Sequence, residues 1–262
     1  MKKEKKKRYI VILAVLIIYV VLMLLFVGKD ALVKNKDATT IIVGDYTVWN
    51  YSDNNWLNIT NSTTLDDISW LDYDVYLDNK ELGKYYLWYD DNKWYIFDQN
   101  KKAINKEGSL LAFRSNYDIK VKNFDTKEIR NYYHVNKVLE ENNLSTSSKY
   151  TVANEVSLDI DSDGQEETLY FVSNAFPLDF SPSKTFTFVF MVKNSKIYQI
   201  YNDVAPYKLN NGCKPYLSAV MDIDQDSTYE IVVSCGRYSV SKPVDMLYKF
   251  TEEEFEILIS NQ

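Results

Sequence analysis

The chain has 262 residues and a formal net charge of −7, and six of its basic residues lie within the first eight positions, so the remainder carries an excess of 12 negative charges. Such an acidic surface disfavours nucleic acid and anionic lipid as partners. The residues beyond position 36 suffice for one large domain or two small domains with hydrophobic cores.

The first predicted element is a membrane span. Residues 9–27 form an unbroken apolar run directly after the basic residues 1–8. The run is long enough to cross roughly 30 Å of hydrocarbon as a helix, and its basic flank predicts a cytoplasmic N-terminus with the bulk of the chain outside. We therefore expect an uncleaved signal anchor; a cleaved signal peptide is the alternative, but residues 26–30 offer no convincing small-x-small site. Residues 28–38 are polar and should form a short stalk.

Residues 39–122 contain two similar segments that each predict an aromatic β-hairpin. Each has a glycine five residues before one tryptophan and a second tryptophan shortly after: Gly44, Trp49 and Trp56 in the first copy, and Gly83, Trp88 and Trp94 in the second. Tryptophans at equivalent strand positions predict core packing between the hairpins. Stacking of these rings on a sugar ligand is the alternative.

Residues 123–149 carry the clear helix signal of the part that follows the stalk. Asp125 and Thr126 offer an N-cap, and most apolar residues from Ile129 to Leu139 fall on one helical stripe before an Asn-Asn pair ends it. We expect one helix here that connects two β-rich parts of the fold.

Residues 150–262 show a regular order of strands, in which two acidic loops occupy equivalent places. Each loop has an aspartate at every second residue and closes with a glutamate: Asp159, Asp161, Asp163 and Glu167 in the first, and Asp222, Asp224, Asp226 and Glu230 in the second. Crowded carboxylates repel one another without a cation, and Ca²⁺ accepts several oxygen ligands in a flexible shell. The β-forming residues after each loop disfavour an EF-hand. Solvated acidic turns without a metal are the alternative.

Each loop lies between two apolar strands, and the first has the pattern Asp-x-Asp-x-Asp-Gly-x-x-Glu. This arrangement resembles the calcium loop of FG-GAP and VCBS-type repeats, which form the blades of integrin-α-like β-propellers. The likeness covers residues 156–173 and 219–235 and, more loosely, the four strands around each. It implies an all-β fold of propeller-like four-stranded blades with up to two structural Ca²⁺ ions. It also implies that the eight carboxylates named above are ligands, with the backbone carbonyls of Gln165 and Thr228. Ser227 replaces the usual glycine, which predicts a strained or weaker second loop.

Two cysteines, Cys213 and Cys235, bracket the second acidic loop. A chain that reaches the cell exterior would place them in oxidising surroundings, where a disulfide can form and persist. We expect this bridge to staple one hairpin, with two unlinked thiols as the alternative.

The sequence shows no Gly-x-Ser-x-Gly elbow, no Cys/His arrangement and no zinc-like histidine spacing. It therefore predicts a membrane-anchored, calcium-braced, non-enzymatic module that recognises an extracellular protein or glycan, in adhesion or envelope sensing. A cell-envelope carbohydrate-active hydrolase and a structural subunit of an envelope complex are the alternatives.

Overall fold

The computed structural model describes residues 38–52, 55–60, 62–105, 107–175, 184–206, 212–236 and 242–261. The predicted cytoplasmic tail and membrane span, and all but the last residue of the predicted stalk, lie outside these ranges. Within them, neither helix combines the length and the hydropathy needed to cross a bilayer.

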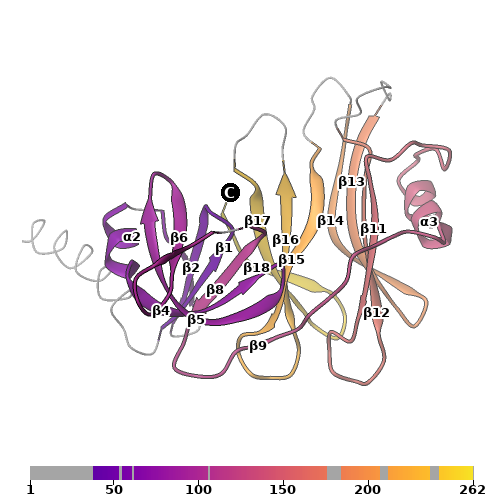
Figure 1. The fold of residues 1–262 in the computed structure, drawn as a ribbon. Helices are drawn as coiled ribbons and strands as arrows, with labels where there is room; N and C mark the ends of the chain where they lie inside the picture. The colour runs from indigo at the N-terminus through magenta and orange to yellow at the C-terminus, as the bar shows by residue number, and fades with distance from the viewer. Residues whose placement is uncertain are drawn as a thin grey trace, which may run out of the picture.

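The first part of the described chain forms an eight-stranded antiparallel sheet, called here the wide sheet (Figure 1). Its strands lie in the order β3-β2-β1-β8-β4-β5-β6-β7. Their bounds are β1 Thr39–Val43, β2 Thr47–Ser52, β3 Asn55–Asn58, β4 Leu71–Leu77, β5 Lys80–Asp90, β6 Lys93–Phe97, β7 Ala103–Ile104 and β8 Leu110–Arg114. Helix α2, Ser62–Ile68, connects β3 to β4.

Two five-stranded antiparallel sheets follow. The outer sheet has the order β10-β11-β12-β13-β14, with bounds Lys127–Glu128, Val152–Leu158, Glu167–Ser173, Lys184–Lys193 and Lys196–Pro206. The middle sheet has the order β18-β17-β16-β15-β9, with bounds Phe255–Ser260, Val244–Phe250, Glu230–Gly236, Lys214–Asp222 and Lys120–Val121. Helix α3, Tyr133–Glu141, lies between β10 and β11 in the chain. Each of these sheets is thus a four-stranded meander with one short added strand.

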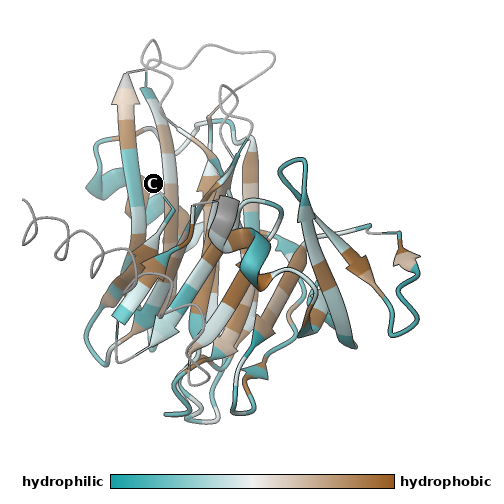
Figure 2. Ribbon diagram, turned by 90° about the vertical axis from the view of Figure 1, so that its left-hand side faces the viewer, coloured by the Kyte–Doolittle hydropathy of each residue, from teal (hydrophilic) through white to brown (hydrophobic). Residues whose placement is uncertain are grey.

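The three sheets stack face to face, and a helix covers each end of the stack (Figure 1). One apolar cluster joins the outer and middle sheets, a second joins the middle and wide sheets, a third joins the outer sheet to α3, and a fourth joins the wide sheet to α2. Figure 2, which faces α2, shows this helix lying across apolar segments of the wide sheet. The resulting order of layers is α2, wide sheet, middle sheet, outer sheet and α3.

Strands buried on both faces explain the apolar runs of the second half of the chain. In β16, Ile231 and Val233 pack toward the outer sheet, whereas Val232 between them packs toward the wide sheet. In β12, Phe171 packs toward the middle sheet and Val172 toward α3. Successive side chains of a strand point to opposite faces, so a sheet with two neighbours needs apolar residues at consecutive positions.

The prediction of an all-β fold with repeated four-stranded antiparallel units is confirmed for β11–β14 and β15–β18. The described residues do not form a closed ring of blades. They form a row of three sheets, because α2 and α3 occupy the two faces on which further sheets would have to pack. The two predicted hairpins contribute strands to one wide sheet rather than forming blades of their own.

Two of the tryptophans are buried in the core, but they do not pack between the hairpins as predicted, because Trp49 packs toward the middle sheet and Trp94 packs under α2. Trp49 and Trp94 are 0% and 2% exposed, whereas Trp56 and Trp88 are half-buried. Trp88 and Trp94 lie on neighbouring strands of one hairpin but on opposite faces of the wide sheet, since only the second packs in the cluster under α2. Equivalence in the sequence repeat therefore does not mean equivalence in burial.

The predicted connecting helix exists, but its predicted start near Asp125 is wrong. The helix begins at Tyr133, because Lys127 and Glu128 form β10 and pair with β11 at the edge of the outer sheet. Pairing with an open sheet edge satisfies their backbone groups as a helix would. The sequence analysis also missed α2, a helix of seven residues that is too short to show a clear apolar period.

The predicted disulfide between Cys213 and Cys235 is present, with the two Cα atoms 5.3 Å apart. It joins the start of β15 to β16 within the middle sheet. The Cys213 carbonyl also accepts hydrogen bonds from the hydroxyls of Ser173 and Thr187 in the outer sheet, at 2.7 and 3.0 Å. The bridge therefore lies where two sheets are linked by buried polar contacts.

A buried carboxylate links the wide and middle sheets. Asp245 in β17 is 2% exposed, and its Oδ2 accepts a hydrogen bond from the Thr47 hydroxyl of β2 at 2.5 Å. The Ser234 hydroxyl donates to its other oxygen. Burial raises the pKa of Asp245, while these hydrogen bonds act in the opposite direction. The ionised form of the Asp245 carboxylate is thus stabilised by the hydroxyl groups that donate to it.

We predict that Thr47→Val lowers the free energy of unfolding by about 1–3 kcal/mol, because a buried carboxylate loses a donor. The pKa of Asp245 would rise further in the folded state, so this loss should grow as pH rises from about 4 to 7 and the group ionises. Chemical denaturation at both pH values measures it, with Thr146→Val at an exposed position as the control. Equal losses in the two variants would contradict the prediction.

Candidate metal sites

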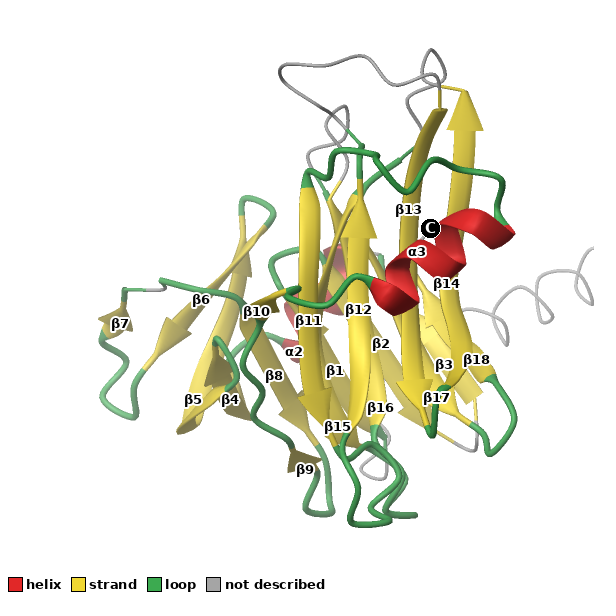
Figure 3. Ribbon diagram, turned by 90° about the vertical axis from the view of Figure 1, so that its right-hand side faces the viewer, coloured by secondary structure: helices red, strands yellow, loops and turns green. Residues whose placement is uncertain are grey.

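The two predicted acidic loops lie at the same end of the outer and middle sheets (Figures 1 and 3). The first connects β11 to β12, and the second connects β15 to β16. The loops contact each other: the Ser162 hydroxyl donates to the Ser227 carbonyl at 2.7 Å. The Tyr229 N–H also donates to the Ile160 carbonyl at 2.8 Å. They therefore form one paired structure rather than two independent turns.

Each loop gathers three carboxylates that could hold one ion. In both groups the three side chains offer oxygen atoms within 4.8 Å of one another: Asp159, Asp161 and Glu167 in the first loop, and Asp222, Asp224 and Glu230 in the second. This clustering suits oxygen ligands around one divalent cation. The structure thus brings together six of the predicted ligand residues.

The other predicted ligand residues lie beside these groups. Asp163 and Asp226 accept the N–H of the residue two positions on, from Gln165 and Thr228 respectively, each at 2.8 Å. The two aspartates therefore shape the turn of each loop. That the carbonyl groups of Gln165 and Thr228 bind an ion stays a prediction.

The backbone of each loop holds its closing glutamate in the same way. Glu167 Oε2 accepts the Ile160 N–H, and Glu230 Oε2 accepts the Ile223 N–H, both at 2.8 Å. This bond fixes the carboxylate at the start of the second strand of each unit. It leaves the other carboxylate oxygen for the interior of the loop.

In the second loop, two buried carboxylate oxygens have no hydrogen-bond partner within the described residues. They are Asp222 Oδ1 and Glu230 Oε1, on residues that are 2% and 1% exposed. The Glu230 oxygen has only an ion pair at 3.5 Å, with the Lys249 ammonium. Burial raises the pKa of Glu230 to about 7. A buried polar atom without a partner is costly, and a bound metal ion would supply the missing interaction. The second loop therefore fits a cation on grounds independent of residue spacing.

A lysine that the sequence analysis did not predict completes the first cluster. Lys193, the last residue of β13, lies 2.7 Å from Asp163 Oδ2 and 3.3 Å from Glu167 Oε1, and it also donates to Asp161. Partial burial disfavours the ammonium, but the hydrogen bonds outweigh it and raise the pKa of Lys193. The same ammonium lowers the pKa of Asp163 through its hydrogen bond. The first loop thus closes on a positive charge.

The second cluster repeats this arrangement with Lys249 of β17. Its ammonium nitrogen lies 2.5 Å from Asp224 Oδ2, 2.6 Å from Asp226 Oδ2 and 3.5 Å from Glu230 Oε1. Partial burial again disfavours the ammonium, and the hydrogen bonds again raise the pKa of Lys249. The third strand of each four-stranded unit therefore supplies a lysine to the loop between the first two strands.

The lysines decide what a metal ion must compete with. An ammonium offers three donors to the carboxylates, whereas Ca²⁺ accepts six to eight oxygen ligands. An ion can therefore use more of the oxygens in each loop, but it has to displace the ammonium first. Each loop closes on its own lysine, and such competition would weaken its affinity for an ion.

We predict that Lys193→Met has opposite effects with and without Ca²⁺. In chelator the variant should unfold at a lower temperature, because it leaves the carboxylates of the first loop without a counter-charge. In titrations it should bind Ca²⁺ at least tenfold more tightly than the unaltered chain, which corresponds to about 1.4 kcal/mol. Calorimetric titration and thermal unfolding measure the two effects.

The control for this prediction is Lys184→Met, at the exposed opposite end of the same strand. It removes one positive charge without touching either loop, so both properties should stay unchanged. Weaker Ca²⁺ binding in Lys193→Met would show that the lysine supports the site rather than competing for it.

The backbone of the second loop follows that of the first. The φ angles are 58° at Ser162 and 62° at Gln225, and they are 87° at Gly164 and 73° at Ser227. A left-handed conformation costs a residue with a Cβ atom roughly 1–2 kcal/mol. The strain predicted at Ser227 is therefore present, and the glycine of the first loop avoids it.

We predict that Ser227→Gly raises the free energy of unfolding by about 1 kcal/mol, because glycine adopts this conformation without steric cost. Gly164→Ser is the matched variant and should lower it by a similar amount. A Cβ atom at Gly164 would meet no atom within 4 Å, so that loss reports backbone strain alone. Thermal unfolding in chelator measures both variants. No change in either would contradict the strain.

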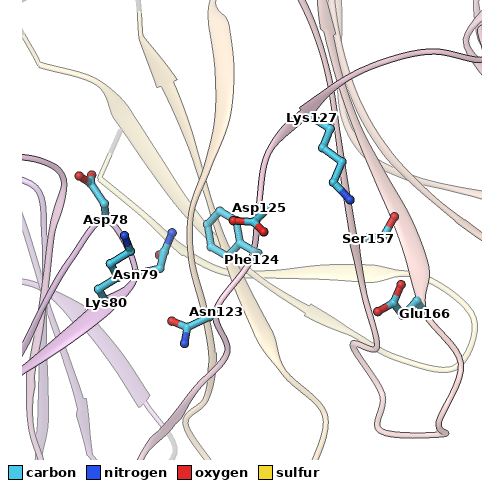
Figure 4. A pocket seen from close by; sticks show the side chains of 9 residues that line it. All are labelled: Asp78, Asn79, Lys80, Asn123, Phe124, Asp125, Lys127, Ser157 and Glu166. Atoms are coloured by element: carbon cyan, nitrogen blue, oxygen red, sulfur yellow. The ribbon is translucent and has the colours of Figure 1, made fainter.

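A polar cleft of about 430 Å³ lies between the wide and outer sheets and reaches the first acidic loop at Glu166 (Figure 4). Its lining residues are Asp78, Asn79, Lys80, Asn123, Phe124, Asp125, Lys127, Ser157 and Glu166. Figure 4 shows the three carboxylates spread along the cleft on separate segments, with no two of them facing each other. A glycosidase needs a carboxylate pair on either side of the scissile bond. This cleft does not present such a pair.

Comparison of the sequence with protein-family models and with curated proteins, and of the fold with solved structures, found no match. The resemblance to FG-GAP and VCBS-type repeats therefore stays a prediction that depends on the acidic loops themselves.

Proposed function

We propose that this chain is a membrane-anchored recognition protein whose extracytoplasmic β-rich domain is braced by structural Ca²⁺ at its two acidic loops. Residues 9–27 would serve as the anchor, with residues 1–8 in the cytoplasm. The domain that follows would recognise an extracellular protein or a glycan, in adhesion or envelope sensing. The observation that carries the proposal is the pair of clustered carboxylate groups, each of which contains a buried oxygen that makes no hydrogen bond within the described residues, Asp161 Oδ1 in the first and Asp222 Oδ1 in the second.

The ion would act by ordering the paired loops. Asp222, Asp224 and Glu230 would hold it in the second loop, with Asp159, Asp161 and Glu167 as their counterparts in the first. The hydrogen bonds between the loops connect the outer sheet to the middle sheet. Order in one loop therefore supports the other, and it also supports the contact between the two sheets. In this proposal the units β11–β14 and β15–β18 are calcium-loop blades in an open row.

The disulfide supports an exterior location for the domain. Structural disulfides form and persist in oxidising compartments and are rare in the cytosol, and Cys213 is bonded to Cys235. A loop of this length contributes about 3 kcal/mol by restricting the unfolded chain. Bridge and ion would together stabilise the middle sheet from its two ends.

We predict that Ca²⁺ raises the unfolding temperature of the full chain purified in detergent. Extracellular calcium modules have Kd values of about 0.1–1 mM, so 2 mM free ion stabilises each site by about 0.7–1.8 kcal/mol. At about 2–4 °C per kcal/mol for a domain of this size, each site should add roughly 1–7 °C. Thermal unfolding in chelator, Ca²⁺ and Mg²⁺ measures the effect.

Two double variants assign the effect to the loops. Asp161→Ala/Asp163→Ala and Asp222→Asn/Asp224→Asn should each lose part of the response to Ca²⁺. Asp66→Ala/Asp67→Ala, at exposed positions of α2, should keep all of it. An unfolding temperature of the unaltered chain that is the same in chelator and in Ca²⁺ would refute the metal sites.

A further inference from the structure

The wide sheet extends beyond the middle sheet that covers it. The middle sheet has five strands, and its contacts with the wide sheet involve Ile41, Val43, Trp49, Leu111 and Phe113 on β1, β2 and β8. Figure 3 shows β5, β6 and β7 projecting past this contact. One face of the β5–β6 hairpin packs under α2 through Leu87, Trp94 and Ile96. The residues between them face the other way, on the overhanging part of the sheet.

This overhanging face carries a strip of aromatic rings, called here the aromatic strip: Trp70, Trp88, Tyr95 and Phe97. Trp88 pairs with Tyr95 across the hairpin, with ring centroids 5.7 Å apart. The Trp70 ring is stacked beside that of Trp88 at 6.0 Å and an interplanar angle of 21°, and it lies 4.8 Å from Phe97. Trp70 is 43% exposed and Tyr95 is 39% exposed. The strip is therefore a continuous set of ring contacts that is open to solvent.

The backbone at Trp70 is held in a conformation that favours glycine. Its φ angle is 60°, and its N–H donates to the Leu87 carbonyl at 2.6 Å. A bulky side chain with positive φ is an outlier, and such strain often accompanies functional positions. Here the strained turn places an indole at the surface, in line with the ring of Trp88, which points to a use for that indole outside the core.

Hydrogen-bond donors and acceptors lie at the two ends of the aromatic strip. The Lys101 ammonium lies 5.7 Å from the centroid of Trp70 at one end. At the other end of the strip, Lys84 lies on the same face of β5 as Trp88 and forms an ion pair with Asp74 at 3.2 Å. Both residues line a cleft of about 350 Å³, together with Glu81, Ser115, Asn116 and Asp118. Donors and acceptors thus flank stacked rings along about 13 Å of strand between Lys84 and Trp88.

The charge of the molecule restricts what can stack on these rings. Nucleic-acid bases stack on aromatic side chains, but their binding also needs a basic groove for the backbone, and the chain beyond position 8 has an excess of 12 negative charges. A neutral polyhydroxyl ligand fits better, because each hydroxyl can donate to a carboxylate and accept from a lysine. Flat apolar faces of pyranose rings suit the exposed indoles.

We propose that the aromatic strip binds a neutral oligosaccharide, with pyranose rings on Trp88 and Trp70 and with hydroxyl groups in the cleft beside Lys84 and Asp74. This inference rests on the proposed function, because it names a glycan as the recognised ligand and gives it a place. It does not depend on Ca²⁺, since the strip lies on the wide sheet and both acidic loops lie on the other two sheets.

The test is a binding measurement on the full chain, in a detergent without sugar headgroups. Chitotetraose, cellotetraose and maltotetraose are titrated by calorimetry and by tryptophan fluorescence, and a printed array of neutral glycans widens the range. We expect saturable binding of at least one glycan. Trp88→Ala and Trp70→Ala should each weaken it at least tenfold, and Trp88→Phe, which keeps a ring, should weaken it less.

Tyr133→Ala is the matched control, since this ring on α3 is 67% exposed and lies at the far end of the stack. It should bind the glycan as the unaltered chain does. Thermal unfolding checks each variant, and Trp70→Ala decides the question if Trp88→Ala fails to fold. Absence of binding to every glycan at millimolar concentration would overturn the proposal, as would equal binding by Trp70→Ala and Tyr133→Ala. The proposal would also be overturned if the aromatic strip bound a protein partner and bound none of the glycans.

The outcome is separable from that of the calcium experiment. Glycan binding by a chain whose unfolding temperature ignores Ca²⁺ would leave the aromatic strip standing and remove the metal sites. A response to Ca²⁺ without glycan binding would do the reverse.

Discussion

The middle sheet is buried on both of its faces, and the arrangement of the rest of the molecule follows from this. A sheet with two apolar faces needs a neighbour on each side, and here the neighbours are the wide sheet and the outer sheet. Those two sheets then present one further apolar face each, which α2 and α3 cover with Ile68, Leu139 and other apolar side chains. Capping by helices ends the row and leaves polar surfaces outward, as terminal repeats do in other stacked architectures. The row also sets both acidic loops side by side, because neighbouring sheets place their equivalent turns at the same end.

The acidic loops balance charge in a way that neither loop achieves with its own residues. The nine residues of each loop carry five carboxylates in the first loop and four in the second, which would repel one another strongly in a partly buried turn. Each turn is nevertheless kept compact by backbone N–H groups and by one ammonium from the third strand. The lysine explains how the loops can hold their shape in a metal-free chain. In the proposed function it would also give them a graded response to an ion, because binding would replace one cation by another instead of filling an empty cluster. A weak, structural calcium site follows more readily from such an exchange than a tight one.

The tryptophans show how one sheet places similar residues in the core on one face and at a partly exposed surface on the other. Trp94 and Trp88 lie on adjacent strands, but the strand period turns the first into the core and the second to the opposite face, where it is half-buried. What leaves Trp88 open is the difference in width between the wide sheet and the middle sheet. If the middle sheet were wider, the same ring would be a core residue. The aromatic strip is therefore a consequence of how the sheets overlap.

The sequence by itself determined the local features of this protein. The alternation of apolar and polar residues, with the turn residues between them, predicted the four-stranded units. The period of the aspartates predicted both acidic loops, and the positions of the two cysteines predicted the disulfide. Each of these features depends on residues close together in the chain or on a single pair of residues. Tertiary structure alone decided the rest. Lys193 and Lys249 could not be assigned to the loops from spacing, since the connection from β12 to β13 is longer than that from β16 to β17. The edge of the outer sheet turned the expected start of a helix into β10, and the stacking of sheets separated buried from exposed tryptophans. These outcomes depend on which surfaces meet in space, and a one-dimensional pattern does not contain that information.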